Sequence, residues 1–584
     1  MDLQDEIKYH LLRNAVRHGG RAMPKAILGA ILGAHPEMRR EARHVLEIAG
    51  RLADEINAMA PEEQESALRA YGIVEERTAE RGLPSLRDAQ GNEWEGEVVM
   101  RFAPGPSGPL HIGHTRALVL NDEYVRRYGG RLILRIEDTN PANILEDAYD
   151  MIREDVEWLG VAVHEVAIQS DRIDIYYDHV RELLDMGAAY VCTCPVEEWR
   201  TLKLERRACP HREGAGDLDR WARMLDGTYA QGEASLVVKT DLDHLNPAAR
   251  DFVAMRIVET PHPRTGDRYR VYPTYNFAVA IDDHLMGMTH ILRGKDHLNN
   301  TLRQQYVYRH LGWDEPVFIH YGWVRIEGVV LKTSTIKEAI ARGEFTGWDD
   351  VRLGTLRAMR ARGIRPEAIR ETWVEVGAKE VDIVFSWENL YSHNRKLVDD
   401  LAPRFFFAPD PVRLDIHTGG PLRMSAPIQP DHPERGAREY LLEPENGVVW
   451  VHVPGDDLPP EGLIRLKDLC NVDLRPDSEG GARSPPDPAR PDGLEVVGAS
   501  MVRSAEYAGN DLSVLKEGVR IIQAVPDPGA LPCTVRMPDG SCIEGLVERG
   551  IERIEPMTVA QFERFGFVNV VSVGDHVLCN FAHR

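Results

Sequence analysis

The sequence is poor in cysteine and contains no long hydrophobic run. Seven cysteines among 584 residues are too few for a disulfide framework, which indicates a reducing compartment. No apolar stretch approaches the roughly 20 residues that a transmembrane helix needs. The first ten residues, MDLQDEIKYH, lack the basic start and apolar core of a signal peptide. We therefore expect a cytoplasmic protein with no membrane association.

The sequence also lacks an excess of basic residues. Its 70 lysines and arginines stand against 93 acidic residues, a formal net charge of −23, which counts against wholesale electrostatic binding of nucleic acid. A local basic face is compatible with this charge, and an acidic remainder would then favour product release; a role in solubility alone is the alternative. The length predicts several domains, each able to bury its own core.

What the sequence does contain is a strand–loop–helix–strand unit at residues 97–141. The apolar run at 98–102 is typical of a buried parallel strand, and the loop that follows, APGPSGP, is rich in proline and glycine. Apolar spacing predicts a helix over 112–128, and two glycines separate it from a second strand at 131–136. This order predicts the opening unit of a nucleotide-binding parallel sheet.

A His-Ile-Gly-His sequence at 111–114 lies where the loop becomes the helix. Backbone N–H groups and the helix dipole favour phosphate at a helix N-terminus. The two imidazoles add hydrogen-bond donors, and the glycine between them lets a flat ring approach the backbone. Four residues recur by chance, but their position between strand and helix makes them a specific signal for binding nucleotide phosphates.

The parallel sheet is expected to resume after an insertion. The segment 290–297 is an apolar strand that ends in charged residues and a glycine. In a doubly wound sheet this end of a strand faces the ligand crevice. The apolar pattern predicts that a helix at 299–311 and a strand at 318–321 follow.

Cysteine and histidine cluster within the expected insertion. A C-x-C pair and a C-x-H pair lie about fifteen residues apart, and three of the seven cysteines fall within eighteen residues. Thiolates and an imidazole at these spacings can close a tetrahedral Zn²⁺ site, and four ligands leave no open position for catalysis. Unligated thiols, or a site lost in this protein, are the alternatives. The candidate ligands are Cys192, Cys194, Cys209 and His211.

Arginine crowds a helical segment that runs from residue 350 to about 391. No acidic residue interrupts the stretch from Arg352 to Pro366. Such a run is usually a solvated face, but in an acidic protein it is a candidate patch for an RNA backbone. The predicted RNA contacts are Arg357, Arg360, Arg362 and Arg365.

The two ends of the chain differ in texture. Residues 1 to about 94 show apolar positions at helical spacing and no catalytic signature. Past residue 401, short strands separated by proline, glycine and aspartate predict an all-β, barrel-like module. Within it, residues 475–493 are of low complexity and are predicted to form a flexible loop.

The sequences RFAPGPSGPLHIGH, LRIEDTNP, YPTYNFA and ILRGKDH together resemble the glutamyl-tRNA synthetases, which are class I aminoacyl-tRNA synthetases. The resemblance runs from about residue 96 to the C-terminus. The N-terminal extension and the β-rich C-terminal half resemble the archaeal type, whose anticodon-binding region is shared with glutaminyl-tRNA synthetases. The implied fold is multi-domain α/β, with a class I Rossmann-like catalytic domain, helical segments and a C-terminal all-β barrel anticodon-binding region.

The resemblance also implies a division of the chain into domains. The expected regions are an N-terminal helical extension (1–94), the first half of the catalytic domain (95–190), an inserted acceptor-binding subdomain with the zinc candidate (191–270), the second half of the catalytic domain (271–345), a helical tRNA-stem contact region (346–400) and the anticodon-binding barrels (401–584).

The resemblance implies a two-step, ATP-dependent reaction. L-Glutamate attacks the α-phosphate of ATP, giving glutamyl-adenylate and pyrophosphate, and the terminal ribose of tRNA(Glu) then accepts the glutamyl group. No side chain need become a covalent nucleophile, so catalysis depends on positioning and on stabilising phosphate charge, with Mg²⁺ on the phosphates. We expect a monomer. The archaeal resemblance adds the hypothesis of a non-discriminating enzyme that also glutamylates tRNA(Gln).

The amino-acid pocket can be argued from chemistry as well as from the resemblance. A substrate with a side-chain carboxylate needs a buried cation, and arginine offers a bidentate fork; Arg101 and Arg293 are the two candidates. The resemblance supports Arg101 for the substrate side chain and Glu137 for its α-ammonium group, with Tyr275 and Ala103 as further substrate-binding residues. The alternative is that Arg101 and Glu137 pair with each other across adjacent strands.

The resemblance assigns the nucleotide to the other motif residues. It implies that His111 and His114 contact the ATP phosphates and that Gly113 packs against the adenosine. Gly294 and Asp296, at the later strand end, are candidates for the ribose and base of the nucleotide.

The second class I signature, K-M-S-K-S, is altered in this chain. Its place is taken by VLKTSTIK at 330–337, whereas archaeal relatives commonly read L-S-T-S-K. Lys332 or Lys337 could supply the cation that closes on the pyrophosphate, because lysine carries its charge on a long flexible stem. Ser334 is an expected ATP contact, and both lysines remain catalytic candidates.

Two other functions compete with glutamylation of tRNA. A glutaminyl-tRNA synthetase shares the architecture, but Glu137 in LRIEDTNP stands where glutaminyl enzymes usually have aspartate. A non-catalytic tRNA-binding paralogue is suggested by the altered loop at 330–337, although the histidine, arginine and acidic positions are intact. A shorter relative that glutamylates a modified tRNA base lacks the C-terminal barrels, so the length of this chain argues against it.

Overall fold

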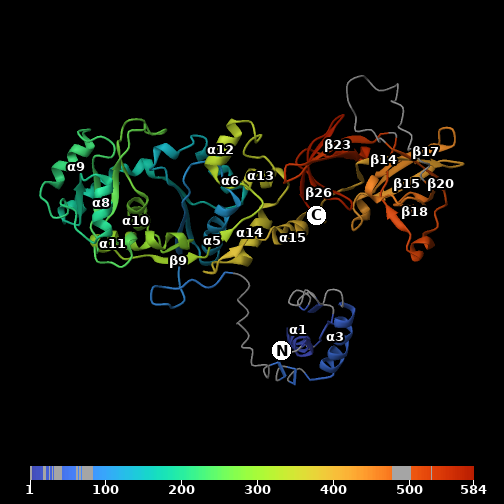
Figure 1. Cartoon of the computed structure of the whole chain (residues 1–584), viewed down its shortest axis with the longest axis horizontal. Coiled ribbons are helices and arrows are strands. Elements are labelled where there is room, and N and C mark those ends of the chain that lie inside the picture. Colours follow the sequence, from blue (N-terminus) through green and yellow to red (C-terminus); the bar gives the residue numbers. More distant parts are fainter. Residues whose placement is uncertain are drawn as a thin grey trace. The chain divides into compact units, whose positions relative to one another are not determined.

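The computed structural model describes residues 3–17, 21–24, 27–28, 31, 42–60, 63–64, 67–68, 83–476, 501–527 and 529–584 (Figure 1). The chain divides into two compact units, a first unit of residues 1–81 and a second unit of residues 82–584. The low-complexity loop predicted at 475–493 lies outside the described residues except for its first two positions. None of the helices that the structure describes has the length and apolar composition required to traverse a lipid bilayer.

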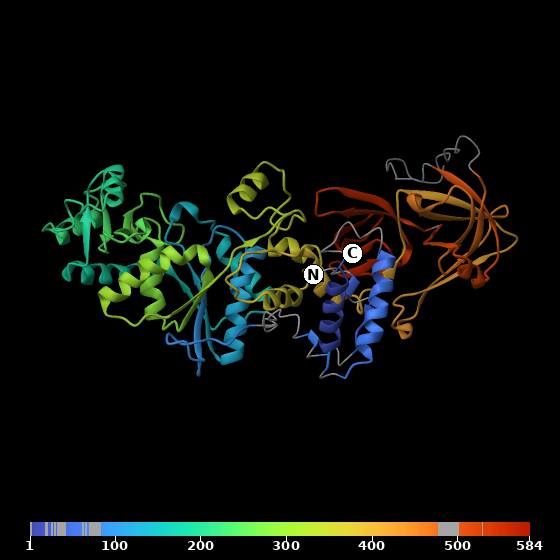
Figure 2. The ribbon, with the colours of Figure 1, turned by 60° about the horizontal axis from the view of Figure 1, so that its bottom comes forward.

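The first unit contains two helices that lie side by side, α1 (Leu3–Arg17) and α3 (Ala42–Asn57) (Figure 2). Apolar side chains spaced three or four residues apart, such as Ile7 and Leu11 on α1 and Ile56 on α3, are fully buried between them. The helical prediction is therefore correct for these segments. It is wrong for residues 83–94, which belong to the second unit and form a turn in which Arg87 pairs with Glu93.

A parallel sheet forms the core of the N-terminal part of the second unit. Its strands β1 (Val98–Phe102), β2 (Gly130–Ile136) and β3 (Glu165–Ile168) are paired in parallel in that order. The parallel pair β8 (His290–Gly294) and β9 (Val317–Tyr321) joins at the β1 edge, where the Thr289 N–H donates to the Val99 carbonyl at 3.0 Å. The sheet thus resumes after an insertion, as the sequence predicts.

Helices connect these strands as in a nucleotide-binding sheet. Helix α5 (Ile112–Tyr128) joins β1 to β2, and α6 (Ala148–Trp158) joins β2 to β3. Buried side chains from β1, β2 and α5 share one hydrophobic core. Because parallel strands leave their carboxyl ends at one edge, the loops after β1, β2 and β8 meet there.

The insertion is an antiparallel sheet with its own hydrophobic core. Its strands are β4 (Ala189–Cys192), β5 (Ser235–Val238), β6 (Phe252–Ile257) and β7 (Val271–Pro273). The helices around it are α7 (Ile173–Asp185), α8 (Val196–Leu204), α9 (Asp217–Leu225), α10 (Tyr275–Leu285) and α11 (Leu298–Leu311). Helix α10 returns the chain to the parallel sheet.

A helical segment follows the parallel sheet. It contains α12 (Thr333–Ala341), α13 (Leu356–Ala361), α14 (Pro366–Val376) and α15 (Trp387–Val398). The prediction of helix over 350–391 is correct for α13 and α14. It misses the short strand β11 (Ile383–Val384), which pairs in parallel with β10 (Val324–Arg325), and it ends before α15 does.

The C-terminal region, from residue 404 onward, is built from two seven-stranded sheets within the described residues. We call the sheet that holds the first and last strands of this region the outer sheet. Its edge strands are β12 (Arg404–Phe405) and β13 (Phe407–Pro409), with a single residue between them in sequence. We call the other sheet, whose strands lie between these in sequence, the inner sheet. Its edge strands are β21 (Arg520–Ile522) and β22 (Val525–Pro526), which follow one another directly in the order of strands along the chain. Each sheet therefore curls until its two edges meet, and the prediction of an all-β, barrel-like module is confirmed.

The remaining strands fill these two sheets and one hairpin. The outer sheet also contains β23 (Leu531–Arg536), β24 (Cys542–Val547), β25 (Val559–Phe562), β26 (Gly566–Ser572) and β27 (Val577–His583). The inner sheet also contains β14 (Pro411–His417), β17 (Val448–Pro454), β18 (Gly462–Leu466), β19 (Cys470–Leu474) and β20 (Val502–Tyr507). The hairpin is β15 (Leu422–Pro427) with β16 (Ala437–Leu442).

Candidate active site

A cavity of about 440 Å³ opens at the carboxyl ends of the parallel strands. Its lining brings together nine residues singled out in the sequence, from β1, α5, the loop after β2, α10 and the end of β8. They are Arg101, Ala103, Gly113, His114, Glu137, Tyr275, Arg293, Gly294 and Asp296. The cavity lies where the loops of a doubly wound sheet converge, which is the usual ligand position for this fold.

The two histidines of the motif hold the first turn of α5. His111 is the N-cap residue, and its Nδ1 accepts from the Gly113 N–H at 3.1 Å. The Nδ1 of His114 accepts from the His111 N–H at 3.3 Å, and the two rings stack with centroids 3.5 Å apart. Because each Nδ1 is an acceptor, each neutral ring carries its proton on Nε2.

Burial keeps these two imidazoles uncharged. It lowers the pKa of His111 to about 4. Burial lowers the pKa of His114 well below the usual histidine value, and the neighbouring His111 adds to the effect. At neutral pH both rings therefore offer neutral Nε2–H donors beside a helix N-terminus, which suits the binding of phosphate oxygens.

The charged residues of the cavity are linked by Asp283, which lies on α10. The Arg101 Nε donates to Asp283 at 3.1 Å, and the Arg135 Nη1 donates to the same oxygen at 2.6 Å. Arg135 also donates to Glu137 at 3.0 Å. Arg101 thus pairs with Asp283 rather than with Glu137, so the direct Arg101–Glu137 pair weighed from the sequence is not the arrangement found.

Burial and charge act in opposite directions on these carboxylates. Burial alone would raise the pKa of Asp283. The guanidinium groups of Arg101 and Arg135 lower this pKa by more than burial raises it, so the net shift is downward. Burial raises the pKa of Glu137, and Arg135 and Arg101 only partly offset that rise. Asp283 is therefore firmly ionised, whereas the ionised form of Glu137 would be stabilised by the ammonium group of a substrate.

Arg293 is a buried cation held by uncharged acceptors. Its guanidinium donates to Thr301 Oγ1 at 2.5 Å, to Gln304 Oε1 at 2.8 Å and to the Tyr275 hydroxyl at 3.4 Å. The Nε of Arg293 is buried and has no hydrogen-bond partner within the described part of the chain. This guanidinium can accept an anionic ligand without first breaking an ion pair.

The altered loop lies beside the cavity rather than in its lining. Lys332 directly precedes α12, Ser334 and Lys337 lie in its first turns, and all three are exposed. The start of α12 contacts the proline-rich loop, since a Cβ added at Gly108 would come within 2.5 Å of the Thr333 methyl group. The structure thus places the proline-rich loop before the histidine motif next to the altered loop at 330–337, through residues 108 and 333.

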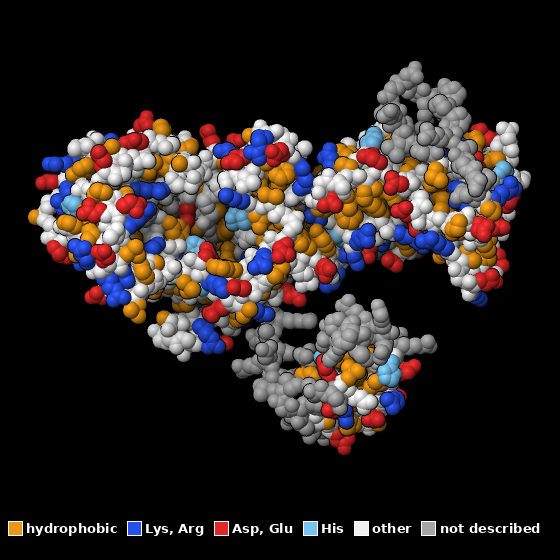
Figure 3. Space-filling view, viewed as in Figure 1, with side chains coloured by type: hydrophobic (Ala, Val, Ile, Leu, Met, Phe, Trp, Pro, Cys, Tyr) orange, Lys and Arg blue, Asp and Glu red, His pale blue; other side chains and the backbone are white. Residues whose placement is uncertain are grey.

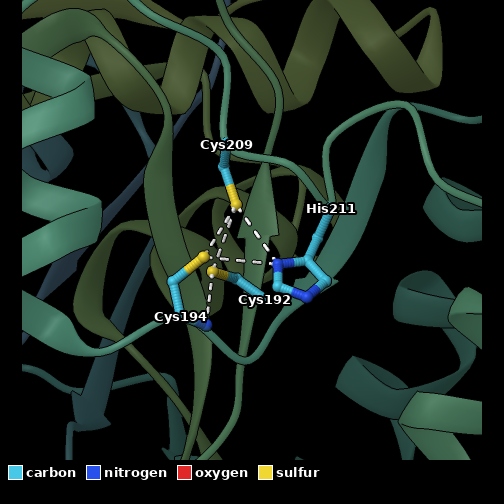
Figure 4. Close-up of side chains that lie close together, drawn as sticks. All are labelled: Cys192, Cys194, Cys209 and His211. Carbon is cyan, nitrogen blue, oxygen red and sulfur yellow. Dashed lines mark hydrogen bonds between the residues drawn. The ribbon is translucent and has the colours of Figure 1, made fainter.

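The candidate zinc ligands converge in the insertion (Figure 4). The Cys192 and Cys209 sulfurs lie 3.4 Å apart, and the Nδ1 of His211 lies 3.4 Å from the sulfurs of both Cys194 and Cys209. All four ligand atoms fall within 4.8 Å of one another. The Nε2 of His211 faces the Thr193 hydroxyl at 3.0 Å, which fixes the ring. This donor set fits a tetrahedral zinc ion.

The arginines of the helical segment do not act as one surface. Arg362 is buried and donates to the backbone carbonyls of Phe581 and Ala582 in β27, so its prediction as an RNA contact is wrong. Arg357 pairs with Glu154. Arg360 and Arg365 are exposed. Figure 3 shows acidic and basic side chains interspersed over the visible face, so any basic patch is local.

Two of these arginines line a second cavity. It has a volume of about 670 Å³ and lies against the loop after β23. The basic residues in its lining are Arg352, Arg357, Arg360 and Arg536. Arg352 forms an ion pair with Asp350, at 2.6 Å, which neutralises its charge.

A parallel nucleotide-binding sheet with this histidine motif, an inserted antiparallel sheet and an all-β C-terminal module together define a class I aminoacyl-tRNA synthetase. The family model for the catalytic domain of class I tRNA synthetases (E and Q) matches residues 97–400. The model for the anticodon-binding domain of the same family matches residues 402–483.

Curated relatives match the chain over its whole length. The chain is 47% identical to the glutamate–tRNA ligase of Methanothermobacter thermautotrophicus, covering 100% of both chains. It is 47% identical to that of Methanopyrus kandleri, over 98% of this chain and 97% of the relative, and 43% identical to that of Pyrococcus furiosus, over 99% of each. The chain belongs to the class I tRNA synthetases of the E and Q family.

Proposed function

We propose that this protein is a glutamate–tRNA ligase that joins L-glutamate to tRNA(Glu) by way of glutamyl-adenylate. The observation that carries the proposal is the cavity, in which two buried arginines, Arg101 and Arg293, face the same space as Glu137. Full-length relatives that bear the name glutamate–tRNA ligase support it.

The residues of the cavity divide between the two ends of the amino acid. Arg101 and Arg293 bind the side-chain carboxylate, and Tyr275 adds its hydroxyl beside Arg293. Glu137 accepts from the α-ammonium group, which also lowers its pKa and keeps it ionised. The α-carboxylate is then free to attack the α-phosphate of ATP.

The histidine motif binds the other reactant. The Nε2–H groups of His111 and His114 donate to phosphate oxygens at the N-terminus of α5, where the helix dipole adds to the attraction. Gly113 lines the cavity without a side chain and admits the adenosine, and Gly294 and Asp296, which also line the cavity, bind its ribose and base. Mg²⁺, when bound to the phosphates, neutralises part of their charge.

The net charge of the cavity favours glutamate over glutamine. Among the residues that the structure describes, Arg293 has only uncharged hydrogen-bond partners. A neutral amide would therefore leave a buried cation uncompensated, whereas a carboxylate neutralises it. A glutaminyl-tRNA synthetase is for this reason the weaker candidate.

The nucleic-acid partner is assigned by the C-terminal half. The barrels would bind the anticodon, and the exposed Arg360 and Arg365 would contact the tRNA backbone. The resemblance to the archaeal type adds the hypothesis of a non-discriminating monomer that also charges tRNA(Gln) with glutamate. The four ligands in the insertion would hold a structural Zn²⁺.

A charging assay tests the proposal. Purified protein with ATP, Mg²⁺ and labelled glutamate should produce glutamyl-tRNA from a tRNA(Glu) transcript, and the same concentration of glutamine should give no product. Charging of a tRNA(Gln) transcript with glutamate decides the non-discriminating hypothesis. Absence of any glutamyl-tRNA from a preparation that binds ATP would contradict the proposal. Absence of ATP–pyrophosphate exchange with tRNA present would identify a non-catalytic paralogue.

A further inference from the structure

Four charged side chains form a continuous row behind the amino-acid end of the cavity. In order they are Arg101, Asp283, Arg135 and Glu137, with contacts of 3.1, 2.6 and 3.0 Å between successive members. Their charges alternate, and the two ends of the row are the groups proposed to bind the side chain and the α-ammonium group of glutamate. The two middle members lie behind these ends, since neither is part of the cavity lining.

Asp283 is the member of the row that fixes Arg101. Its Oδ1 accepts from the Arg101 Nε, and its Oδ2 lies 3.5 Å from the Arg101 Nη2, so the carboxylate contacts one side of the guanidinium. The other N–H groups of Arg101 are left to face the cavity. Since both side chains are almost fully buried, few other conformations are open to Arg101.

The row also sets the charge of the amino-acid site. Arg101, Arg135 and Arg293 supply three positive charges, and Asp283 and Glu137 supply two negative ones. The nearby Asp282 is balanced by Arg172, which leaves one positive charge for the ligand to neutralise. The other carboxylate in the lining, Asp296, has a side chain that is 58% exposed, so water screens it. A single negative charge is the net charge of glutamate at neutral pH.

We propose that Asp283 is a positioning residue for glutamate recognition, which orients Arg101 directly and Glu137 through Arg135. The inference rests on the proposed function, because it assigns how the amino acid of that reaction is selected. Asp283 does not touch the substrate in this arrangement. It acts through the two groups that do.

The neighbouring residue, Asp282, allows the effect of orienting Arg101 to be distinguished from the effect of burying a carboxylate in α10. It is equally buried on the same helix, but its carboxylate binds Arg172, Gln169 and Tyr176 at 2.7, 3.0 and 2.7 Å. Its nearest approach to the row is 4.0 Å, to the Arg135 Nε. Asp282 therefore links α10 to α7 and to the turn at Gln169–Arg172 that precedes α7, and it makes no hydrogen bond to Arg101 among the described residues.

The test is the variant Asp283→Asn. An asparagine keeps the shape but loses the negative charge, and its amide N–H₂ group would stand in place of the Oδ2 that faces the Arg101 Nη2 donor. Arg101, which borders the cavity, would then be held less firmly. Glu137, whose pKa Arg101 already lowers, is the carboxylate to which Arg101 would turn, and this would occupy the ammonium-binding group as well. The glutamate KM should rise by about tenfold or more, with the ATP KM changed by less than about twofold.

Asp282→Asn is the matched control. It removes an equally buried charge, so it should lower the melting temperature by a similar amount while it leaves the glutamate KM within about twofold of the wild type. A merely structural role for Asp283 would reduce stability and the fraction of active enzyme without separating the glutamate KM from the ATP KM.

A second variant protects the test against misfolding. Asp283→Glu retains the charge and moves the carboxylate by one methylene, so a folded Asp283→Glu protein should also show a raised glutamate KM. If either folded variant keeps the wild-type glutamate KM, or if the KM values for glutamate and ATP rise together, the inference is overturned. The wild type is assayed first: a wild type that does not charge tRNA with glutamate refutes the proposed function instead.

Discussion

Lys332 directly precedes helix α12, and its side chain is exposed. The next residue, Thr333, contacts the loop that leads into the histidine motif, because a Cβ at Gly108 would come within 2.5 Å of it. Lys337 lies one turn further along α12. We therefore expect the flexible ammonium group of Lys332, rather than that of Lys337, to reach pyrophosphate.

This placement predicts different effects for the two lysines. Lys332→Ala should lower the rate of adenylate formation by about tenfold to a hundredfold, since one charge-assisted contact in the transition state is lost. Lys337→Ala serves as the matched control and should change that rate by less than about threefold. Pre-steady-state ATP consumption measures both. A larger loss in the Lys337 variant would assign the role to that lysine.

The amino-acid site shows how far single residues could be predicted from the sequence. Arg101 and Glu137 lie in motifs with a recognisable spacing, so their meeting in one cavity could be foreseen. Asp283 and Arg135 could not be assigned, because their contact joins positions 148 apart in sequence. The signal that was present is the Asp-Asp pair in the otherwise apolar helix α10, since buried carboxylates need partners.

Between the elements, the segment Leu353–Leu356 connects the histidine motif to the altered loop at 330–337. The Gly354 carbonyl accepts from the Ile112 N–H at 2.9 Å, and the Leu356 N–H donates to the Leu110 carbonyl at 2.9 Å. On the other side, the Gly354 N–H donates to the Val330 carbonyl at 3.2 Å. The sequence LGTL has no pattern that predicts this role, because these three hydrogen bonds join backbone groups alone.

The zinc candidate is a prediction about the inserted element. Burial raises the pKa of Cys194 to about 11 and raises that of Cys192 further, so a bound cation is needed to stabilise the thiolates. Purified protein should contain one zinc per chain by atomic emission. Cys209→Ser should lose the metal and lower the melting temperature, because the ion ties the loop at 209–211 to the end of β4.

The control for that experiment is Cys542→Ser. Cys542 is exposed in the C-terminal half, so its replacement should leave both the zinc content and the melting temperature unchanged. Wild-type protein that is free of zinc after preparation in zinc-containing medium would contradict the prediction.

At the scale of the whole second unit, the helical segment and the outer barrel meet at a polar joint. Arg362 donates to the carbonyls of Phe581 and Ala582, and Asn569 and Asn580 donate to the Ala361 carbonyl at 2.9 Å each. The sequence placed Arg362 in a basic run and so suggested an exposed residue. Its burial depends on strands more than 200 positions later in the chain, which no local pattern reveals.

His583 makes this joint sensitive to acid. Burial, aided by Arg395 and Arg362, lowers the pKa of His583 to about 4, and its Nε2 accepts from the Asn394 amide at 2.9 Å. The unfolded chain binds this proton near pH 6.5 and the folded chain does not. Stability should therefore fall as the pH drops from about 6.5 to about 4, by up to roughly 3 kcal/mol for this residue.

Urea unfolding at pH 7.0 and 4.5 measures this loss. His583→Gln should be less stable at pH 7.0 but should lose less stability between the two pH values than the wild type does. His576→Gln replaces an exposed histidine and should keep the wild-type difference. An unchanged difference in the His583 variant would show that the acid sensitivity arises elsewhere, for example at His111 or His320, where burial also lowers the pKa to about 4.

The closure of the outer barrel has a consequence for how the chain is made. Its first strands, β12 and β13, pair with β25 and β24, as in Arg404 with Gln561 and Phe407 with Val547. These partners emerge from the ribosome 157 and 140 positions later, after the whole inner sheet. The inner sheet can thus form during synthesis before the outer sheet is complete, because the outer sheet lacks β27 until the end of the chain is made. The contacts of Arg362 with β27 then form last. A chain that stops a few residues early would leave the outer barrel open.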